Sequence, residues 1–272
     1  MSPQEVVRYQ VDDGIATVTL DRPETMNAMN NELMLGITAC MQRVAEDDTV
    51  RVVVLTGNGR GFCAGADLGA IATPDSEKPT HESNESPPED SGADIFNGAI
   101  RAIDTCPVPT VARVNGAAAG GGFGLALSCD ITIAAHSAFF VATFGPRLGI
   151  VPDMGVTWNV PLRVGRARAL GITLLGDRIS AVQAQEWGMI WAAVADQDLD
   201  TEVARVTDVL KRSSPATATR IRQTIKAANH NTLSEQLNLE MEHQAVLLPR
   251  NMHEGARAFM EKREPNFGSE RD

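Results

Sequence analysis

The chain has 272 residues, 43% of them hydrophobic, which is enough for one large domain with a sizeable core. Its formal net charge of -11 argues against nucleic acid or an anionic membrane surface as the main partner, and no apolar run reaches the length of a membrane span. The four cysteines lie far apart without a Cys-x-x-Cys pair and the five histidines lack metal-ligand spacing, so we expect neither a disulfide framework nor a metal site. The chain opens without a basic and apolar leader, and we expect a cytoplasmic protein.

The first part of the chain predicts a hairpin, a helix and a buried strand. Apolar and polar residues alternate over residues 6–11 and 15–20 on either side of an Asp-Gly pair, which is typical of a β-hairpin. Apolar residues at helical spacing predict a helix over residues 31–46, and the apolar run at residues 52–55 predicts a buried strand.

A change of composition follows. Residues 73–90 contain Pro, Ser, Glu, Asp and Asn with almost no apolar side chain, which predicts a mobile surface loop. A helix over residues 93–104, ended by two prolines, leads back to an apolar segment.

The second half predicts further strands and then only helices. Strands are expected at residues 131–135, 139–142 and 190–194, and helices at 156–164, 168–175, 180–188, 203–210, 216–228, 233–247 and 255–261. The pattern therefore predicts an α/β body over residues 1–200 and a helical region over residues 201–272.

The most informative stretch, residues 109–130, runs from a Val-rich strand through three consecutive glycines into a small-residue helix. Gly120, Gly121 and Gly122 let a ligand approach the main chain, and the first N–H groups of the helix lack intrahelical partners, so they can bind a developing anion. A second glycine-rich loop, residues 59–68, could supply another donor from Ala64. Close strand-helix packing alone would also explain the glycines, whereas the spacing of nucleotide-binding loops is absent.

Several separated motifs together resemble one family. They include Phe-Cys-Ala-Gly-Ala-Asp-Leu, Val-Asn-Gly-Ala-Ala-Ala-Gly-Gly-Gly and Leu-Gly-Ile-Val-Pro, and lie at residues 62–68, 114–122, 128–130, 148–152, 176–181 and 259–263. In this order they closely resemble the enoyl-CoA hydratase/isomerase, or crotonase, family over nearly the whole chain.

The resemblance implies a spiral of ββα turns with a C-terminal helical region that packs homotrimers, often stacked in pairs as hexamers. It implies an acyl-CoA thioester substrate, with coenzyme A carried in the substrate and no separate cofactor. The thioester carbonyl would lie between the N–H groups of Ala64 and Gly121. The other positions that match coenzyme A contacts are Gly65, Ala66, Asp67 and Leu68, with Phe259 and Lys262 reaching the ligand, commonly from a neighbouring subunit. For Lys262 a solvated cation on a terminal helix is an equal alternative.

This chain departs from the hydratase pattern at its acidic catalytic positions. Hydratases of the family position water with two glutamates, and the matching positions here are Gly124 and Gly145. Asp153 matches the base of isomerases in the family. In this interpretation Asp153 removes a proton from C2 of a 3-enoyl-CoA, the two N–H groups stabilise the enolate, and the same carboxyl returns the proton at C4. The alternative for Asp153 is an N-cap of the following helix.

The sequence leaves other functions open. A hydratase of fatty-acid β-oxidation and a non-catalytic acyl-CoA-binding protein are the alternatives, the second because both hydratase glutamates are missing. Aryl-CoA dehalogenases place an aspartate at the position of Asp153, but they also carry a Trp where this chain has Gly145 and a histidine base that this chain lacks.

Overall fold

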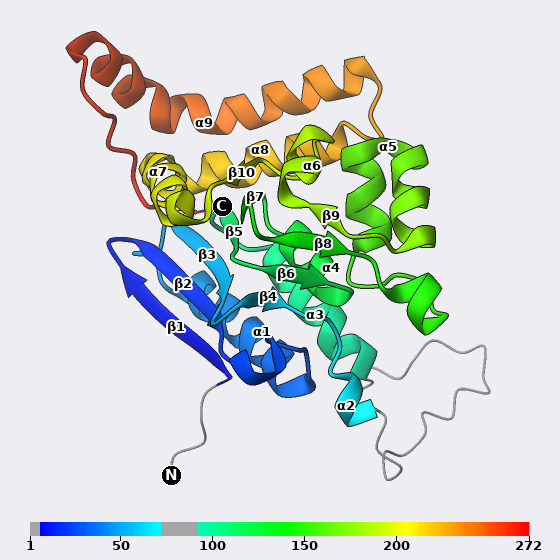
Figure 1. Ribbon diagram of the computed structural model, residues 1–272. Coiled ribbons are helices and arrows are strands. Elements are labelled where there is room, and N and C mark those ends of the chain that lie inside the picture. Colours follow the sequence, from blue (N-terminus) through cyan, green and yellow to red (C-terminus); the bar gives the residue numbers. More distant parts are fainter. Residues whose placement is uncertain (1–5, 72–91, 272) are drawn as a thin grey trace.

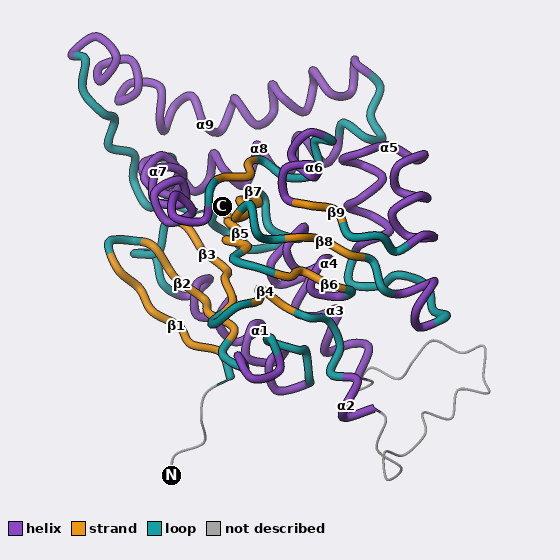
Figure 2. Tube along the Cα trace, viewed as in Figure 1, coloured by secondary structure: helices purple, strands orange, loops and turns teal. Residues whose placement is uncertain are grey.

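The structure is a computed structural model that describes residues 6–71 and 92–271 (Figures 1 and 2). It is organised around two sheets, and successive turns of the chain add strands to both. The first sheet has the strand order β1-β2-β3-β5-β7-β10 and the second β4-β6-β8-β9. Only β1 with β2 and β8 with β9 pair antiparallel among the described strands. The strands are β1 (Val7–Asp12), β2 (Ile15–Leu20), β3 (Val52–Gly57), β4 (Gly61–Cys63), β5 (Thr110–Val114), β6 (Ala117–Ala119), β7 (Ile131–Ala135), β8 (Phe139–Val141), β9 (Ile179–Ser180) and β10 (Ala192–Val194).

Each turn of the spiral contributes one strand to each sheet and then continues into a helix. Strands β3, β5 and β7 lie side by side in the first sheet, while β4, β6 and β8, which follow them, lie side by side in the second. The expected ββα spiral is confirmed. Because β4, β6 and β8 are parallel neighbours, the loops that leave their carboxyl ends meet at one edge of the second sheet.

Helices cover the two sheets. They are α1 (Asn31–Glu46), α2 (Leu68–Ile71), α3 (Gly92–Asp104), α4 (Gly121–Leu127), α5 (Val156–Leu175), α6 (Ala181–Glu186), α7 (Leu199–Arg212), α8 (Pro215–Ala227) and α9 (Leu233–Glu261), with a π-helical turn at Phe144–Leu148 and 3-10 turns at Pro23–Thr25 and Asp196–Asp198. Helix α1 has the bounds that its apolar spacing predicts, and the side chain of Asn30 caps it by accepting a hydrogen bond from the Leu33 N–H at 2.9 Å.

Two helices differ from the expected pattern. Helix α5 spans both predicted helices, but Gly165 interrupts it with non-helical torsions (φ 76, ψ 164) between them. Helix α9 is continuous through Pro249, so the prediction of two separate helices was wrong there. A proline inside a helix removes one backbone hydrogen bond and bends the preceding turn, but it need not end the helix, and a capping box of Thr232 and Glu235 secures the start of α9.

Part of the predicted helical region belongs to the main core. Helix α7, which starts at Leu199, packs on the first sheet and buries Leu199, Val203 and Val206 in the main core. Helices α8 and α9 pack on one another, with α9 along the outside of α8 (Figure 1). No helix in the described ranges has the length and apolar character for crossing a membrane. The loop predicted at residues 73–90 lies outside the described residues.

Candidate active site

Three loops meet at the edge where β4, β6 and β8 end. The Gly120 N–H, in the loop after β6, donates to the Val141 carbonyl at the end of β8 over 2.9 Å. A Cβ placed on Gly65, in the loop after β4, would lie only 2.9 Å from the Ala119 carbonyl oxygen and 3.5 Å from the Gly121 nitrogen. The close approach requires glycine at position 65, which also has a left-handed φ of 93°. The loops after β4 and β6 are therefore in direct contact beside the Gly121 amide.

The first main-chain donor at this junction is Ala66 rather than Ala64. The Ala64 N–H already donates to the Met26 carbonyl oxygen at 3.0 Å, so the prediction that it would bind a thioester was wrong. Met29 forms a parallel bridge to Ala66, accepting from the Asp67 N–H at 3.0 Å and donating to the Gly65 carbonyl at 2.7 Å. In such a bridge the N–H and C=O groups of the central residue, here Ala66, point away from the partner segment that carries Met29. The Ala66 N–H accordingly has no partner within residues 6–71 and 92–271.

The second donor is the predicted one, Gly121. It is the first residue of α4, where an N–H has no intrahelical acceptor, and no other described residue accepts from it. Gly120 turns the chain into the helix with φ 51 and ψ -124, which glycine adopts readily. A side chain at position 121 would overlap the Met29 Cε and lie 3.1 Å from the Met154 Cγ. Met29 and Met154 therefore fill the space on the Cβ side of Gly121.

Asp153 lies in the loop that follows β8, immediately before a reversal of the chain. Met154 and Gly155 both adopt left-handed conformations (φ 51 and 74), and the Val156 N–H donates to the Asp153 main-chain carbonyl at 3.0 Å. The N-cap of α5 is Gly155 and no side chain caps the helix, so the N-cap interpretation of Asp153 was wrong. Asp153 is exposed in the single chain, yet the protein around its carboxylate desolvates it enough to raise its pKa above the ordinary value.

The loop that carries Asp153 packs on α4. A Cβ placed on Gly124 would overlap the carbonyl oxygen of Met154 and lie 2.7 Å from the Met154 Cβ. Gly124 is one turn along from Gly121, and Met154 contacts both positions. The main chain next to Asp153 therefore rests on the helical turn whose first amide is the Gly121 donor.

Comparison with known proteins decides the family. A family model described as "Enoyl-CoA hydratase/isomerase" matches residues 10–270. The chain belongs to the enoyl-CoA hydratase/isomerase family. The "1,2-epoxyphenylacetyl-CoA isomerase" of Escherichia coli K12 is 41% identical over 97% of this chain and 98% of its own length. A "Probable enoyl-CoA hydratase" of Rhodobacter capsulatus is 40% identical over 96% of this chain and 97% of its own. The crystal structure of an enoyl-CoA hydratase from Bacillus anthracis superposes with a TM-score of 0.87 at 28% identity, over 97% of this chain and all of that one.

Within this enoyl-CoA hydratase/isomerase chain, the positions that match the hydratase glutamates are structurally distinct. Gly124 is buried against Met154, which leaves no room for a side chain without movement of the loop. Gly145 lies exposed in the π-helical turn, where a Cβ would meet the Thr173 carbonyl oxygen at 3.3 Å. The first position therefore lacks both the carboxylate and the space for one.

The predicted coenzyme A contacts fall in two separate places. Ala64, Gly65, Ala66, Asp67 and Leu68 lie together in the loop after β4, where the Asp67 carboxylate pairs with the Arg22 guanidinium at 2.9 Å and Leu68 is about half exposed. Phe259 and Lys262 lie at the end of α9, on the far side of the molecule from α2 (Figure 1), and Phe259 is 82% exposed. One chain alone does not bring these two groups of residues together.

The sequence pattern did not reveal that residues 22–29 hold the loop after β4. Asn27 is fully buried, and its side-chain amide donates to the carbonyl oxygens of Asn58, Gly61 and Phe62 at 2.9–3.1 Å. It therefore ties residues 22–29, which include Met26 and Met29, to the β3–β4 connection. The sequence feature that could have indicated this role is an Asn in a turn-rich link, because Asn tolerates the left-handed φ of 58° found here.

Other reactive groups do not form a second centre. Among described residues, no group of three or more His, Cys, Asp or Glu side chains could hold a metal ion. Cys63 lies close to the junction but is fully buried, and burial raises the pKa of its thiol to about 12, so it is inert as a nucleophile.

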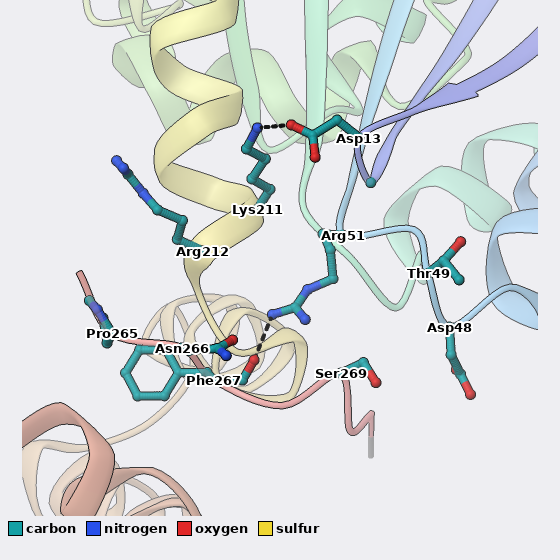
Figure 3. Close-up of a pocket in the computed structure, with 11 residues that line it drawn as sticks. Asp13, Asp48, Thr49, Arg51, Lys211, Arg212, Pro265, Asn266, Phe267 and Ser269 are labelled. Atoms are coloured by element: carbon teal, nitrogen blue, oxygen red, sulfur yellow. Dashed lines mark hydrogen bonds and ion pairs between the residues drawn. The ribbon is translucent and has the colours of Figure 1, made fainter. Parts of the chain in front are cut away.

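A cavity of about 530 Å³ lies elsewhere, between the β1–β2 turn, the start of β3, the end of α7 and the C-terminal segment (Figure 3). Its charged groups are engaged: Lys211 pairs with Asp13, and Arg51 donates to the main-chain carbonyls of Ser213 and Phe267. These contacts attach the C-terminal segment to the body, so we assign the cavity a structural role.

Proposed function

We propose that this protein is an acyl-CoA isomerase that shifts a double bond through a thioester enolate, converting a 3-enoyl-CoA, or a related ring-derived CoA thioester, into the 2-enoyl isomer. The observation that carries the proposal is the combination of two unpaired main-chain donors, Ala66 and Gly121, with one acidic side chain, Asp153, on a loop packed against the same helical turn. The name of the isomerase from E. coli, which is 41% identical, supports the same reaction class.

The chemistry needs the donors and the base together. A thioester α-proton is too weakly acidic for a carboxylate unless the enolate oxygen is stabilised as it forms, and each such donor is worth about 3–4 kcal/mol. The Asp153 carboxylate takes the proton from C2, and the electron pair of that C–H bond moves into the enolate, whose oxygen accepts from Ala66 and Gly121. The protonated carboxyl then delivers the same proton to C4, which leaves the double bond between C2 and C3. No second acid and no water are consumed.

The raised pKa of Asp153 suits this double role. A carboxyl that must accept a proton and then donate it works best when the pKa of the carboxyl lies nearer to the working pH than that of a free aspartate. Desolvation supplies that shift here. A bound acyl chain would remove more water from the carboxylate and shift the pKa further in the same direction.

Asp153→Asn is the direct test. It preserves shape but removes the base, so the kcat for isomerisation of a 3-enoyl-CoA, followed by absorbance of the conjugated product, should fall by about 10²–10⁴. Asp198→Asn, at an exposed position in the turn before α7, is the control and should leave kcat unchanged. Wild-type turnover in Asp153→Asn would remove this side chain from the mechanism.

The same assays separate isomerase from hydratase. The relative from R. capsulatus is named a probable hydratase, so formation of 3-hydroxyacyl-CoA from a 2-enoyl-CoA should be measured in parallel. With glycine at positions 124 and 145, we expect hydration to be far slower than isomerisation. Fast hydration that survives Asp153→Asn would favour the hydratase.

The site is completed by a neighbouring copy in a homotrimer, or in two stacked trimers. Apolar side chains along α8 and α9 are exposed in the single chain: Ile221, Ile225, Leu233, Leu237, Met241, Leu248, Met252, Phe259 and Met260. Burial of such a face is favourable, and it would carry Phe259 and Lys262 toward another subunit's coenzyme A. Light scattering should give three or six times the 29.1 kDa of one chain, and a monomer would refute this assembly.

A further inference from the structure

A partly buried arginine that the proposed mechanism does not use holds the carboxyl end of α4. The Arg163 guanidinium, from α5, donates to the Leu127 carbonyl at 2.6 Å and to the Met189 carbonyl at 3.2 Å. A longer contact of 3.4 Å reaches the Cys129 carbonyl. Leu127 is the last residue of α4, where a carbonyl has no donor within the helix. Arg163 therefore caps α4 at the end opposite to the Gly121 amide.

The charge of Arg163 is not neutralised by an acidic side chain. Within the described parts of the chain, no carboxylate forms an ion pair with it. Asp130 interacts with it electrostatically, but the Asp130 carboxylate is held by the Arg222 guanidinium at 2.7 Å. Desolvation lowers the pKa of Arg163, although a guanidinium stays charged in proteins. Its positive charge is therefore met mainly by the main-chain carbonyl dipoles that it contacts.

A neutral donor would be enough to satisfy this end of the helix. The Thr132 hydroxyl does so for the neighbouring carbonyl, that of Ala126, at 3.0 Å. What arginine adds is charge, and a cation at the carboxyl end of a helix is favourable because the helix carries partial negative charge there. The amino end has no side-chain cap, and no described residue accepts from the Gly121 N–H. The charge thus complements the end of α4 that points away from the candidate site.

We propose that Arg163 is a positioning residue of the isomerase: it fixes α4 from the carboxyl end, and its charge strengthens the interaction of the Gly121 amide with the enolate oxygen. The inference rests on the proposed function, because it concerns one of the two donors. A seven-residue helix is about 10 Å long, so the guanidinium is out of contact with the thioester and acts through α4 and through its field. At an effective dielectric constant of about 20, a unit charge roughly 12 Å away changes a rate about tenfold.

The polarisation of a bound thioester carbonyl measures this effect. A 2-enoyl-CoA labelled with ¹³C at the thioester carbonyl is bound to the protein, and its C=O stretching frequency is compared with that of the free compound by difference infrared spectroscopy. Hydrogen-bond donors at the oxygen should lower this frequency in wild type. Arg163→Met, which keeps the length of the side chain but removes its charge and its donors, should abolish part of that shift. The kcat for isomerisation should fall about tenfold, with a smaller change in KM.

Two variants serve as controls. Arg166→Met makes the same substitution three residues further along the chain at an exposed position, and should keep the wild-type frequency and kcat. Arg163→Lys keeps the charge but presents a single nitrogen, so it should abolish a smaller part of the frequency shift. A role in stability alone would lower the free energy of unfolding of Arg163→Met without moving the carbonyl frequency.

The outcomes separate this inference from the proposed function. If wild type lowers the carbonyl frequency and Arg163→Met lowers it equally, Arg163 does not act on the Gly121 amide and the inference is refuted. If the compound does not bind to wild type, or binds with an unchanged frequency, the two amides do not hold the thioester and the proposed function itself fails. Should Arg163→Met not fold, Arg163→Lys must show its smaller loss of the shift, and a wild-type frequency in that variant would refute the inference.

Discussion

Gly124→Ala tests whether the position of Asp153 depends on the packing of its loop against α4. The substitution adds one methyl group to a buried helical position and changes no charge. In an unconstrained helix alanine is the better residue by about 1 kcal/mol, so any loss must come from the surroundings of the new Cβ.

The size of the perturbation follows from the contacts at Gly124. The added Cβ overlaps the Met154 carbonyl oxygen and lies 2.7 Å from its Cβ and 3.1 Å from its carbonyl carbon. Carbon atoms in normal contact are about 3.5–4.0 Å apart, so the loop must retreat by roughly 1 Å. None of these atoms can rotate away, since two belong to the main chain and the third is attached to it. We expect a loss of about 1–3 kcal/mol in the free energy of unfolding, as for other overpacked cores.

The effect on turnover should exceed the effect on binding. A displacement of about 1 Å in a catalytic group can lower the rate by about 10²-fold. The kcat for isomerisation should therefore fall by about that factor, while KM changes less because the predicted coenzyme A contacts of this chain, apart from the Gly121 amide, lie in other segments. Both constants are measured on purified protein below its unfolding temperature.

Gly171→Ala provides the matched control. Gly171 lies in α5 with no atom within 4 Å of the new Cβ, so this variant should unfold no more easily than wild type and keep its kcat. If Gly124→Ala loses stability as expected but turns over at the wild-type rate, the packing of Met154 on α4 does not position the base and the reasoning is refuted.

Three further predictions follow from particular contacts. Because partial desolvation raises the pKa of Asp153 and the base must be ionised, wild-type kcat/KM should rise with pH through an inflection above 3.8, the ordinary value for aspartate, and an inflection below it would contradict the assignment. Asn27→Ala removes the donor that three carbonyl groups share, of which only that of Gly61 keeps a second side-chain donor, from Asn115, and should lower the free energy of unfolding in urea by about 3 kcal/mol, whereas Asn229→Ala, at an exposed position, should change it little. Thr232→Ala removes the capping box of α9 and should cost about 1 kcal/mol, with faster hydrogen exchange in the first turn of that helix; unchanged exchange there would show that the cap is dispensable.

The regular elements were largely predictable because their signals are local. Alternation marked the β1–β2 hairpin, helical spacing marked α1, and a glycine after a helical pattern marked the end of α6. The errors arose where a local signal was outweighed by its context. Pro249 reads as a helix boundary, but α9 continues through it, since a proline removes the hydrogen bond of one residue in a helix of 29.

The unpaired amides show the limit of the same approach at the candidate site. Glycine content indicated both loops, and the structure shows that their main chains approach closely, which requires residues without a Cβ. Which amide is free depends on strand pairing: the bridge from Met29 uses the groups on either side of Ala66 and leaves that N–H unpaired, while Met26 accepts from Ala64. Composition does not show whether Ala64 or Ala66, two residues further along, carries the unpaired amide. Hydrogen bonds between segments distant in sequence determine it.

The sequence by itself determined the α/β class, the order of the elements, the family and the acidic residue at position 153, because these depend on patterns within short segments and on their order. The tertiary structure alone decided which main-chain amides remain unpaired, that Gly124 has no room for a glutamate, and that Met29 and Met154 meet at Gly121. Those properties arise where loops from three parallel strands converge, and convergence depends on the register and packing of the whole spiral.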